Sequence, residues 1–170
     1  MHFIPTGGIS AQNIAKYIAY EKILACGGSW MVNADLINAG EFERITGLCR
    51  EAQLNLLGFS IVHIGINAEN EDAALKAANR FSALFGFQNK VGNSSIFSGD
   101  GIEIMKSPYL GKNGHIAIAT NSVLRARAFL ERQGVEFNSG SARTDAKGNL
   151  TAVYFKEEIG GFAVHLVQKK

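Results

Sequence analysis

The sequence predicts an α+β protein in which two βαβββ modules follow a shorter βαβα segment. The main observation is a repeat: residues 60–170 contain the same order of short apolar runs and one helical stretch twice. Each copy opens on a His-Ile-x-Ile motif, at His63 and at His115. Residues 1–55 differ, because they contain two short apolar runs that each end in a glycine pair before a helix.

The first segment has the pattern of two strand–turn–helix units. Apolar runs at 3–5 and 23–26 predict short strands, and each is followed by a glycine pair. One helix is predicted over 10–20, and a second over 36–52, where apolar residues recur at helical spacing. Strands that alternate with helices in this order are typical of a parallel sheet with crossover helices.

The second segment contains every element of the module twice. The first copy has a strand over 61–67, a helix over 72–85 and then three short strands. The second copy has a strand over 112–121, a helix over 122–133 and further strands to the C-terminus. The polar, glycine-containing stretch 138–148 predicts a loop between two of these strands. The repeat of about fifty residues therefore predicts an internal duplication.

Four polar residues stand in the first and last strands of the two copies: His63, Glu103, His115 and His165. Each lies between apolar neighbours, so its side chain points to the opposite face of the strand. If the two copies pair about a pseudo-twofold axis, the four side chains converge. Imidazole and carboxylate groups suit Zn²⁺, Ni²⁺, Mn²⁺ or Fe²⁺. We therefore predict a divalent metal site, against the alternative of half-buried, hydrogen-bonded strand residues.

The motifs around these residues resemble those of the vicinal oxygen chelate superfamily, which includes glyoxalase I, extradiol dioxygenases and bleomycin-resistance binding proteins. The resemblance rests on Val62-His63-Ile64-Gly65-Ile66, on Ile102-Glu103-Ile104 and on Gly114-His115-Ile116-Ala117-Ile118-Ala119. It implies that paired βαβββ modules hold one metal, which chelates vicinal oxygens of the substrate and stabilises an enediolate-like intermediate. His63, Glu103 and His115 match the ligand pattern of this superfamily, whereas His165 stands where it usually has glutamate.

The exchange of that glutamate for His165 changes the expected chemistry. An imidazole in place of a carboxylate leaves the metal site one unit more positive, which strengthens the Lewis acid. It also removes the base of a glyoxalase-type proton transfer, so Glu103 becomes the candidate catalytic base. The resemblance implies metal-assisted isomerase or lyase chemistry, if the chain is an enzyme. A non-catalytic module that binds small molecules is the alternative.

The glycine-pair segment has a resemblance of its own. Phe3-Ile4-Pro5-Thr6-Gly7-Gly8-Ile9 and Cys26-Gly27-Gly28-Ser29-Trp30-Met31 resemble the C-terminal quarter of 2-keto-3-deoxy-6-phosphogluconate (KDPG)/4-hydroxy-2-oxoglutarate aldolase, a (β/α)₈ barrel. The resemblance implies that Thr6 lines a substrate pocket. It also implies that a substrate phosphate is held by Gly7, Gly8, Gly28 and the Ser29 hydroxyl.

The Schiff-base lysine and the glutamate base of this aldolase family belong to earlier strands, which have no counterpart in these 170 residues. We therefore expect the C-terminal portion of a longer aldolase–chelate fusion, with Met1 as an internal or artificial start. The expected domains are an aldolase-like barrel fragment at 1–55 and a chelate domain at 58–170, with modules 58–108 and 111–170. An alternative function is aldolase activity, a carbon–carbon lyase reaction, in the full-length parent, with the C-terminal domain accessory.

Composition limits the partners and the location. Net charge is +2 and the basic residues are spread along the chain, which argues against binding of nucleic acid or an anionic membrane. No apolar run is long enough to span a bilayer. The two cysteines fit no metal-ligand spacing, so they are expected to be reduced thiols in the cytoplasm. The expected ligand is a small oxygenated molecule or phosphorylated sugar acid, with no organic cofactor. A homodimer is expected, and the modules can pair within one chain or between two.

Overall fold

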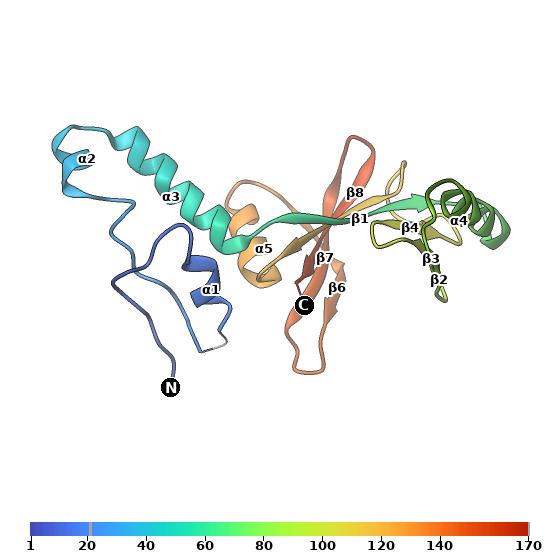
Figure 1. The fold of residues 1–170 in the computed structure, drawn as a ribbon, viewed down its shortest axis with the longest axis horizontal. Coiled ribbons are helices and arrows are strands. Elements are labelled where there is room, and N and C mark those ends of the chain that lie inside the picture. The colour runs from blue at the N-terminus through green and yellow to red at the C-terminus, as the bar shows by residue number, and fades with distance from the viewer. Residues whose placement is uncertain (21, 170) are drawn as a thin grey trace. The chain divides into compact units, whose positions relative to one another are not determined.

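The computed structural model describes residues 1–20 and 22–169, and the chain divides into two compact units, Met1–Phe59 and Ser60–Lys170 (Figure 1). Within the described residues, no helix combines the length and the hydropathy that a membrane crossing requires.

Among its described residues, 1–20 and 22–59, the first unit contains three helices, α1 (Ile14–Ile18), α2 (Ala34–Asn38) and α3 (Phe42–Leu57). The two predicted strands are reduced to a single parallel bridge between Phe3 and Ile23. Two backbone hydrogen bonds accompany this bridge. The amide of Leu24 donates to the carbonyl of Phe3, and the amide of Phe3 donates to the carbonyl of Lys22. The order of elements is thus as expected, whereas a regular sheet does not form here.

The prediction of one helix over 36–52 was wrong. Helix α2 ends at Asn38 and α3 begins at Phe42, with Gly40 between them in the left-handed region at φ +71°. A glycine adopts this conformation without the steric cost of a Cβ, so the chain turns there although the apolar spacing continues. Helix α3 then runs to Leu57 and ends at Gly58, which is also left-handed at φ +59°.

The second unit consists of two βαβββ modules, so the predicted fold class is confirmed. The first module contains β1 (Ser60–Asn67), α4 (Glu71–Phe85), β2 (Asn89–Val91), β3 (Ser95–Ser98) and β4 (Ile102–Met105). The second contains β5 (His115–Thr120), α5 (Val123–Glu131), β6 (Phe137–Thr144), β7 (Leu150–Ile159) and β8 (Phe162–Gln168).

One element of the second module corrects a prediction. Strand β6 occupies most of the stretch 138–148 that the polar composition assigned to a loop. Only the turn around Asp145, whose carboxylate accepts hydrogen bonds from the amides of Lys147 and Asn149, lies outside the strand. Pairing with β7 stabilises β6 although its residues have weak strand propensity, and the pairing is interrupted by register shifts.

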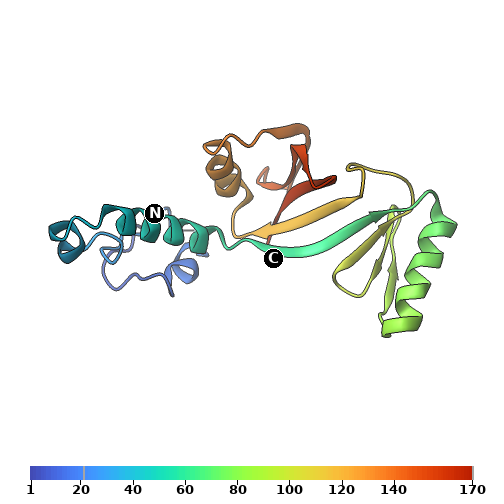
Figure 2. The same ribbon diagram turned by 90° about the horizontal axis from the view of Figure 1, so that it is seen from above.

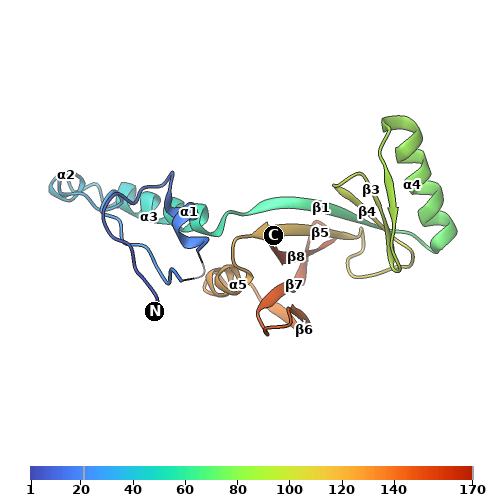
Figure 3. The ribbon, with the colours of Figure 1, turned by 60° about the horizontal axis from the view of Figure 1, so that its bottom comes forward.

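All eight strands form one sheet with the order β2-β3-β4-β1-β5-β8-β7-β6. The two modules meet where β1 pairs with β5 in antiparallel orientation. Strand β4 is parallel to β1 on one side of this pair, and β8 is parallel to β5 on the other. Figures 2 and 3 show β1 and β5 side by side, with α4 near one end and α5 near the other. The modules therefore pair within one chain.

Each helix covers the outer part of its own module. In the first, Ala74 and Ala78 of α4 pack against Ile96 and Ile104 of the sheet. In the second, α5 lies against β7 and β8, and Val123, Ala126, Val153 and Leu166 are all fully or almost fully buried. Because strand side chains alternate, residues that follow or precede these core residues point to the helix-free face of the sheet.

Candidate metal centre

Two rows of paired residues cross the middle of the sheet, and each contains two of the predicted ligands. In the first row, Gly65 of β1 lies between Glu103 of β4 and His115 of β5. Residues that pair across neighbouring strands project to the same face. Glu103 is flanked by Ile102 and by Ile104, which packs under α4, so this row faces away from the helix.

The second row repeats the first with the modules exchanged. Ala117 of β5 lies between His63 of β1 and His165 of β8. His165 is flanked by Val164 and Leu166, both buried, and therefore points to the helix-free face as well. In each row, a residue with little or no side chain thus has one polar side chain on each side of it.

The small residue of the first row is required by the ring of His115. A Cβ added to Gly65 would lie 2.0–2.4 Å from three atoms of this ring, far inside van der Waals contact. The imidazole therefore occupies the space above the Gly65 backbone, where any other residue would place its side chain. This close approach explains why a glycine stands in the middle of a central strand.

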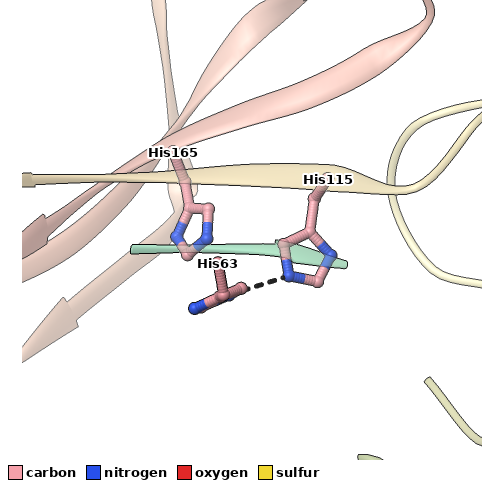
Figure 4. A group of neighbouring side chains, drawn as sticks. All are labelled: His63, His115 and His165. Atoms are coloured by element: carbon pink, nitrogen blue, oxygen red, sulfur yellow. Dashed lines mark hydrogen bonds between the residues drawn. The ribbon is translucent and has the colours of Figure 1, made fainter. Parts of the chain in front are cut away.

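Three atoms of the kinds that bind metal ions, two imidazole nitrogens and one carboxylate oxygen, form a triangle. The Nε2 atoms of His63 and His115 are 3.2 Å apart, and Oε2 of Glu103 is 3.1 Å from each of them. The other carboxylate oxygen, Oε1, accepts a hydrogen bond of 2.6 Å from the hydroxyl of Ser95. His115 is only 2% exposed. Figure 4 shows the His63–His115 contact and the ring of His165 beside it.

No arrangement of protons satisfies all three contacts of this triangle while Glu103 is ionised. A carboxylate only accepts hydrogen bonds, and each Nε2 offers either one hydrogen or one lone pair. If both nitrogens donate to Glu103, two N–H groups face each other; if only one donates, the lone pair of the other faces the carboxylate. A cation in contact with all three atoms removes this conflict.

The spacing of the triangle fits the ligand shell of a divalent metal. Two ligand atoms bound at about 2.1 Å are about 3.0 Å apart at a right angle and about 3.4 Å apart at the tetrahedral angle. The observed separations of 3.1–3.2 Å fall within this range. The nitrogen and oxygen donor set suits Zn²⁺, Ni²⁺, Mn²⁺ or Fe²⁺.

His165 lies beside the two histidines of this triangle. Ring atoms of His63, His115 and His165 lie within 4.8 Å of one another. His165 is 7% exposed, and neither of its ring nitrogens has a hydrogen-bond partner among the described residues. Burial, together with the neighbouring His115 and His63, lowers the pKa of its imidazole to about 3. The ring is therefore neutral at physiological pH, the state in which a histidine binds metal.

Glu103 is held in its ionised form. Burial by itself raises the pKa of the carboxyl group, but hydrogen bonds with His115, His63 and Ser95 together lower it well below its ordinary value. This half-buried group thus offers a negative charge to the site at any pH near neutrality.

Sequence reasoning missed two residues that contact the predicted ligands. Ser95 of β3 binds Glu103, and Tyr154 of β7 stacks on His165 with ring centroids 4.4 Å apart and planes 8° apart. The register of β7 and β8 places Tyr154 directly opposite His165. Alternation within β3 and β7 could not identify either residue, because their contacts with the predicted ligands depend on which strands pair and in which register.

The predicted phosphate residues lie in the first unit. Gly7 and Gly8 have positive φ angles of 79° and 67°, as a tight turn requires. A Cβ on Gly27 would lie 2.9 Å from Cγ2 of Thr6, so the two glycine turns are neighbours. The ring of Trp30 covers Gly28, where an added Cβ would meet three of its carbon atoms at 1.7–2.9 Å.

The N-terminal region of the chain is similar in sequence to known aldolases. The family model of KDPG and KHG aldolase matches residues 1–48. The 2-dehydro-3-deoxy-phosphogluconate aldolase of Treponema pallidum is 48% identical over 58 residues, which cover 34% of this chain and 27% of that protein. The KHG/KDPG aldolase of Escherichia coli K12 is 52% identical over 52 residues, 31% of this chain and 24% of that protein. The chain thus spans about a quarter of the length of these relatives, and its N-terminal region is aldolase-like.

Solved structures similar to the chain cover about two thirds of it at low sequence identity. A hypothetical protein, BH1468 from Bacillus halodurans C-125, has a TM-score of 0.47 and 14% identity over 66% of this chain and 95% of its own. Methylmalonyl-CoA epimerase from Mycobacterium tuberculosis has a TM-score of 0.47 and 15% identity over 65% of this chain and 87% of its own. Likeness at this level carries no argument about reaction or ligand.

Proposed function

We propose that residues 60–170 bind one divalent metal ion and present it to a small oxygenated ligand. The proposed metal ligands are His63, Glu103, His115 and His165. The observation that carries the proposal is the triangle of donor atoms, whose edges of 3.1–3.2 Å match a metal's ligand shell and whose proton conflict a cation removes.

The two histidines and the carboxylate of the triangle each supply one metal-binding atom in this proposal. His63 and His115 offer Nε2, and Glu103 offers Oε2 while Ser95 holds its other oxygen. A bound divalent ion would act as a Lewis acid and polarise an oxygen atom of the small molecule. Glu103 is the one carboxylate of the set and hence the candidate proton acceptor for isomerase or lyase chemistry. In the metal-free site, hydrogen bonds with His115, His63 and Ser95 lower its pKa and make it a weak base.

The experiment is a metal titration of the whole chain with Zn²⁺, Ni²⁺, Mn²⁺ and, under anaerobic conditions, Fe²⁺. We expect one ion per chain with at least one of these metals and loss of binding in His115→Ala. The matched control is His2→Ala, because His2 is exposed and belongs to the first unit. Failure of all four metals to bind, or wild-type binding in His115→Ala, contradicts the proposal and favours a binding module without metal.

A second candidate function concerns the parent of the first unit. The aldolase relatives at 48–52% identity support a KDPG/4-hydroxy-2-oxoglutarate aldolase in the full-length parent, with the chelate domain accessory. Residues 1–55 would then be the end of a barrel. Thr6 would line the substrate pocket, and the substrate phosphate would be held by Gly7, Gly8, Gly28 and Ser29. Borohydride trapping with pyruvate must then label the full-length parent, and it must leave residues 1–170 unlabelled.

We also propose a homodimer in the cytoplasm. Many large apolar side chains of the first unit are exposed, among them Phe3, Tyr20 and Phe42, and association would cover them. Cys26 and Cys49 fit no metal-ligand spacing, which suits a reducing compartment. Mass measurement in solution tests the dimer, and a monomer at micromolar concentration would contradict it.

A further inference from the structure

Tyr154 makes the closest ring contact of the metal centre. Its ring lies parallel to that of His165, with centroids 4.4 Å apart and an angle of 8° between the planes. The contact follows from the register, because Tyr154 of β7 pairs directly with His165 of β8. Tyr109 contacts Tyr154 edge-on at 6.0 Å and thus supports it from another side.

His165 lacks the hydrogen bond that usually orients a metal-binding histidine. Such residues generally donate their second ring N–H to a carboxylate, a carbonyl or water, which fixes the plane of the ring. Within the described residues, both ring nitrogens of His165 are buried without a partner. The plane of this imidazole is therefore set by packing, and the face of Tyr154 is the surface parallel to it.

The duplicated module contains an aromatic residue at the equivalent position. Phe97 of β3 pairs with Glu103 of β4, as Tyr154 of β7 pairs with His165 of β8. Phe97 meets His63 edge-on, at a centroid distance of 5.5 Å and an angle of 86°. An aromatic residue thus stands beside the outer ligand in both rows, and the ring of Tyr154 lies parallel to that of its ligand.

We propose that Tyr154 is the positioning residue of the metal ligand His165, whose imidazole plane it holds so that a ring nitrogen points into the site. This inference rests on the proposed metal-binding function. The ring face performs this role, and the hydroxyl group is not needed. Phenylalanine must therefore replace Tyr154 without loss, whereas a flexible aliphatic side chain must not.

The test is a Co²⁺ titration of the whole chain, followed by the visible absorption of the bound ion. We expect Tyr154→Phe to bind within about twofold of wild type and with the same spectrum. Tyr154→Leu is expected to bind roughly tenfold more weakly, the lower limit for loss of a group that orients a metal ligand, and with a changed spectrum. The control is Phe155→Leu on the same strand, which removes a contact with Phe137 and should lower the Tm but leave the cobalt spectrum unchanged.

A double-mutant cycle separates positioning from a general loss of structure. If Tyr154 acts through His165, Tyr154→Leu has no further effect on cobalt affinity in a His165→Ala background. Additive losses, or a Tyr154→Leu protein with wild-type affinity and spectrum, would overturn the positioning role alone. If the wild-type chain binds neither Co²⁺ nor any of Zn²⁺, Ni²⁺, Mn²⁺ and Fe²⁺, the proposed function fails and the role of Tyr154 fails with it.

A readout in the metal-free chain covers the case in which Tyr154→Leu folds poorly. A ring stacked at 4.4 Å shifts the ring-proton NMR signals of His165 upfield. This shift should persist in Tyr154→Phe and disappear in Tyr154→Leu, and it should also persist in Phe155→Leu. Signals of His165 at random-coil positions in the wild-type chain contradict the inference without reference to any metal.

Discussion

At the scale of single residues, we expect Gly65 to matter to the proposed metal site as well as the proposed ligands. We predict that Gly65→Ala weakens Zn²⁺ binding by about tenfold or more, although it removes no ligand. The reason is that the new Cβ would lie 2.0–2.4 Å from the His115 ring, which must then leave the triangle. Isothermal titration measures the effect.

The control for this variant is Ala117→Gly, at the equivalent position of the other row. It changes the small residue of a central strand without adding an atom, so it should lower stability and leave Zn²⁺ affinity near the wild-type value. Wild-type affinity in Gly65→Ala would show that the His115 ring does not need this space.

Ser95 provides a second prediction at this scale. Ser95→Ala removes the 2.6 Å hydrogen bond to Glu103 and frees the carboxylate to rotate, so Zn²⁺ should bind about tenfold more weakly. Ser98→Ala is a matched control on the same strand, because the Ser98 hydroxyl is buried on the other face and has no partner among the described residues. Equal affinities of the two variants would rule out this role for Ser95.

At the scale of elements, the two long helices of the modules begin at side-chain caps. The side-chain oxygen of Asn70 accepts a hydrogen bond of 2.9 Å from the amide of Ala73, and Ser122 caps α5 in the same way. We predict that Asn70→Ala lowers the free energy of unfolding of the second unit by about 1 kcal/mol. Chemical denaturation measures it, and Asn70→Asp should retain most of the stability because aspartate caps equally well.

The elements also show where sequence patterns suffice. Strand β1 and helix α4 have strong period-two and helical patterns, and their predicted bounds agree with the structure to within one residue. Strand β6 has no such pattern and forms because β7 lies beside it. The helix predicted over 36–52 failed for a different reason: Gly40 turns the backbone, and apolar spacing contains no information about φ.

At the scale of the whole molecule, all four proposed ligands lie in one unit. Binding of an ion should therefore stabilise residues 60–170 and leave the first unit unchanged. At a free Zn²⁺ concentration of 100 times Kd, the expected gain is about 2.7 kcal/mol.

Hydrogen exchange of the whole chain, with Zn²⁺ and with a chelator, measures this difference. Amides of β1, β4, β5 and β8 should exchange more slowly in the presence of the ion, whereas those of α3 in the first unit should not change. Equal protection of α3 would contradict a site confined to the second unit.

The sequence by itself determined the two modules, the aldolase-like segment and the four polar residues with their strands. These follow from local patterns, because alternation along a strand and spacing along a helix are properties of neighbouring residues. Only the tertiary structure decided the rest: the triangle of His63, Glu103 and His115, the support from Ser95 and the stacking of Tyr154 on His165. The physical reason is that these contacts depend on the register between strands. Glu103 and His115 meet across Gly65, for example, and no local pattern specifies that alignment.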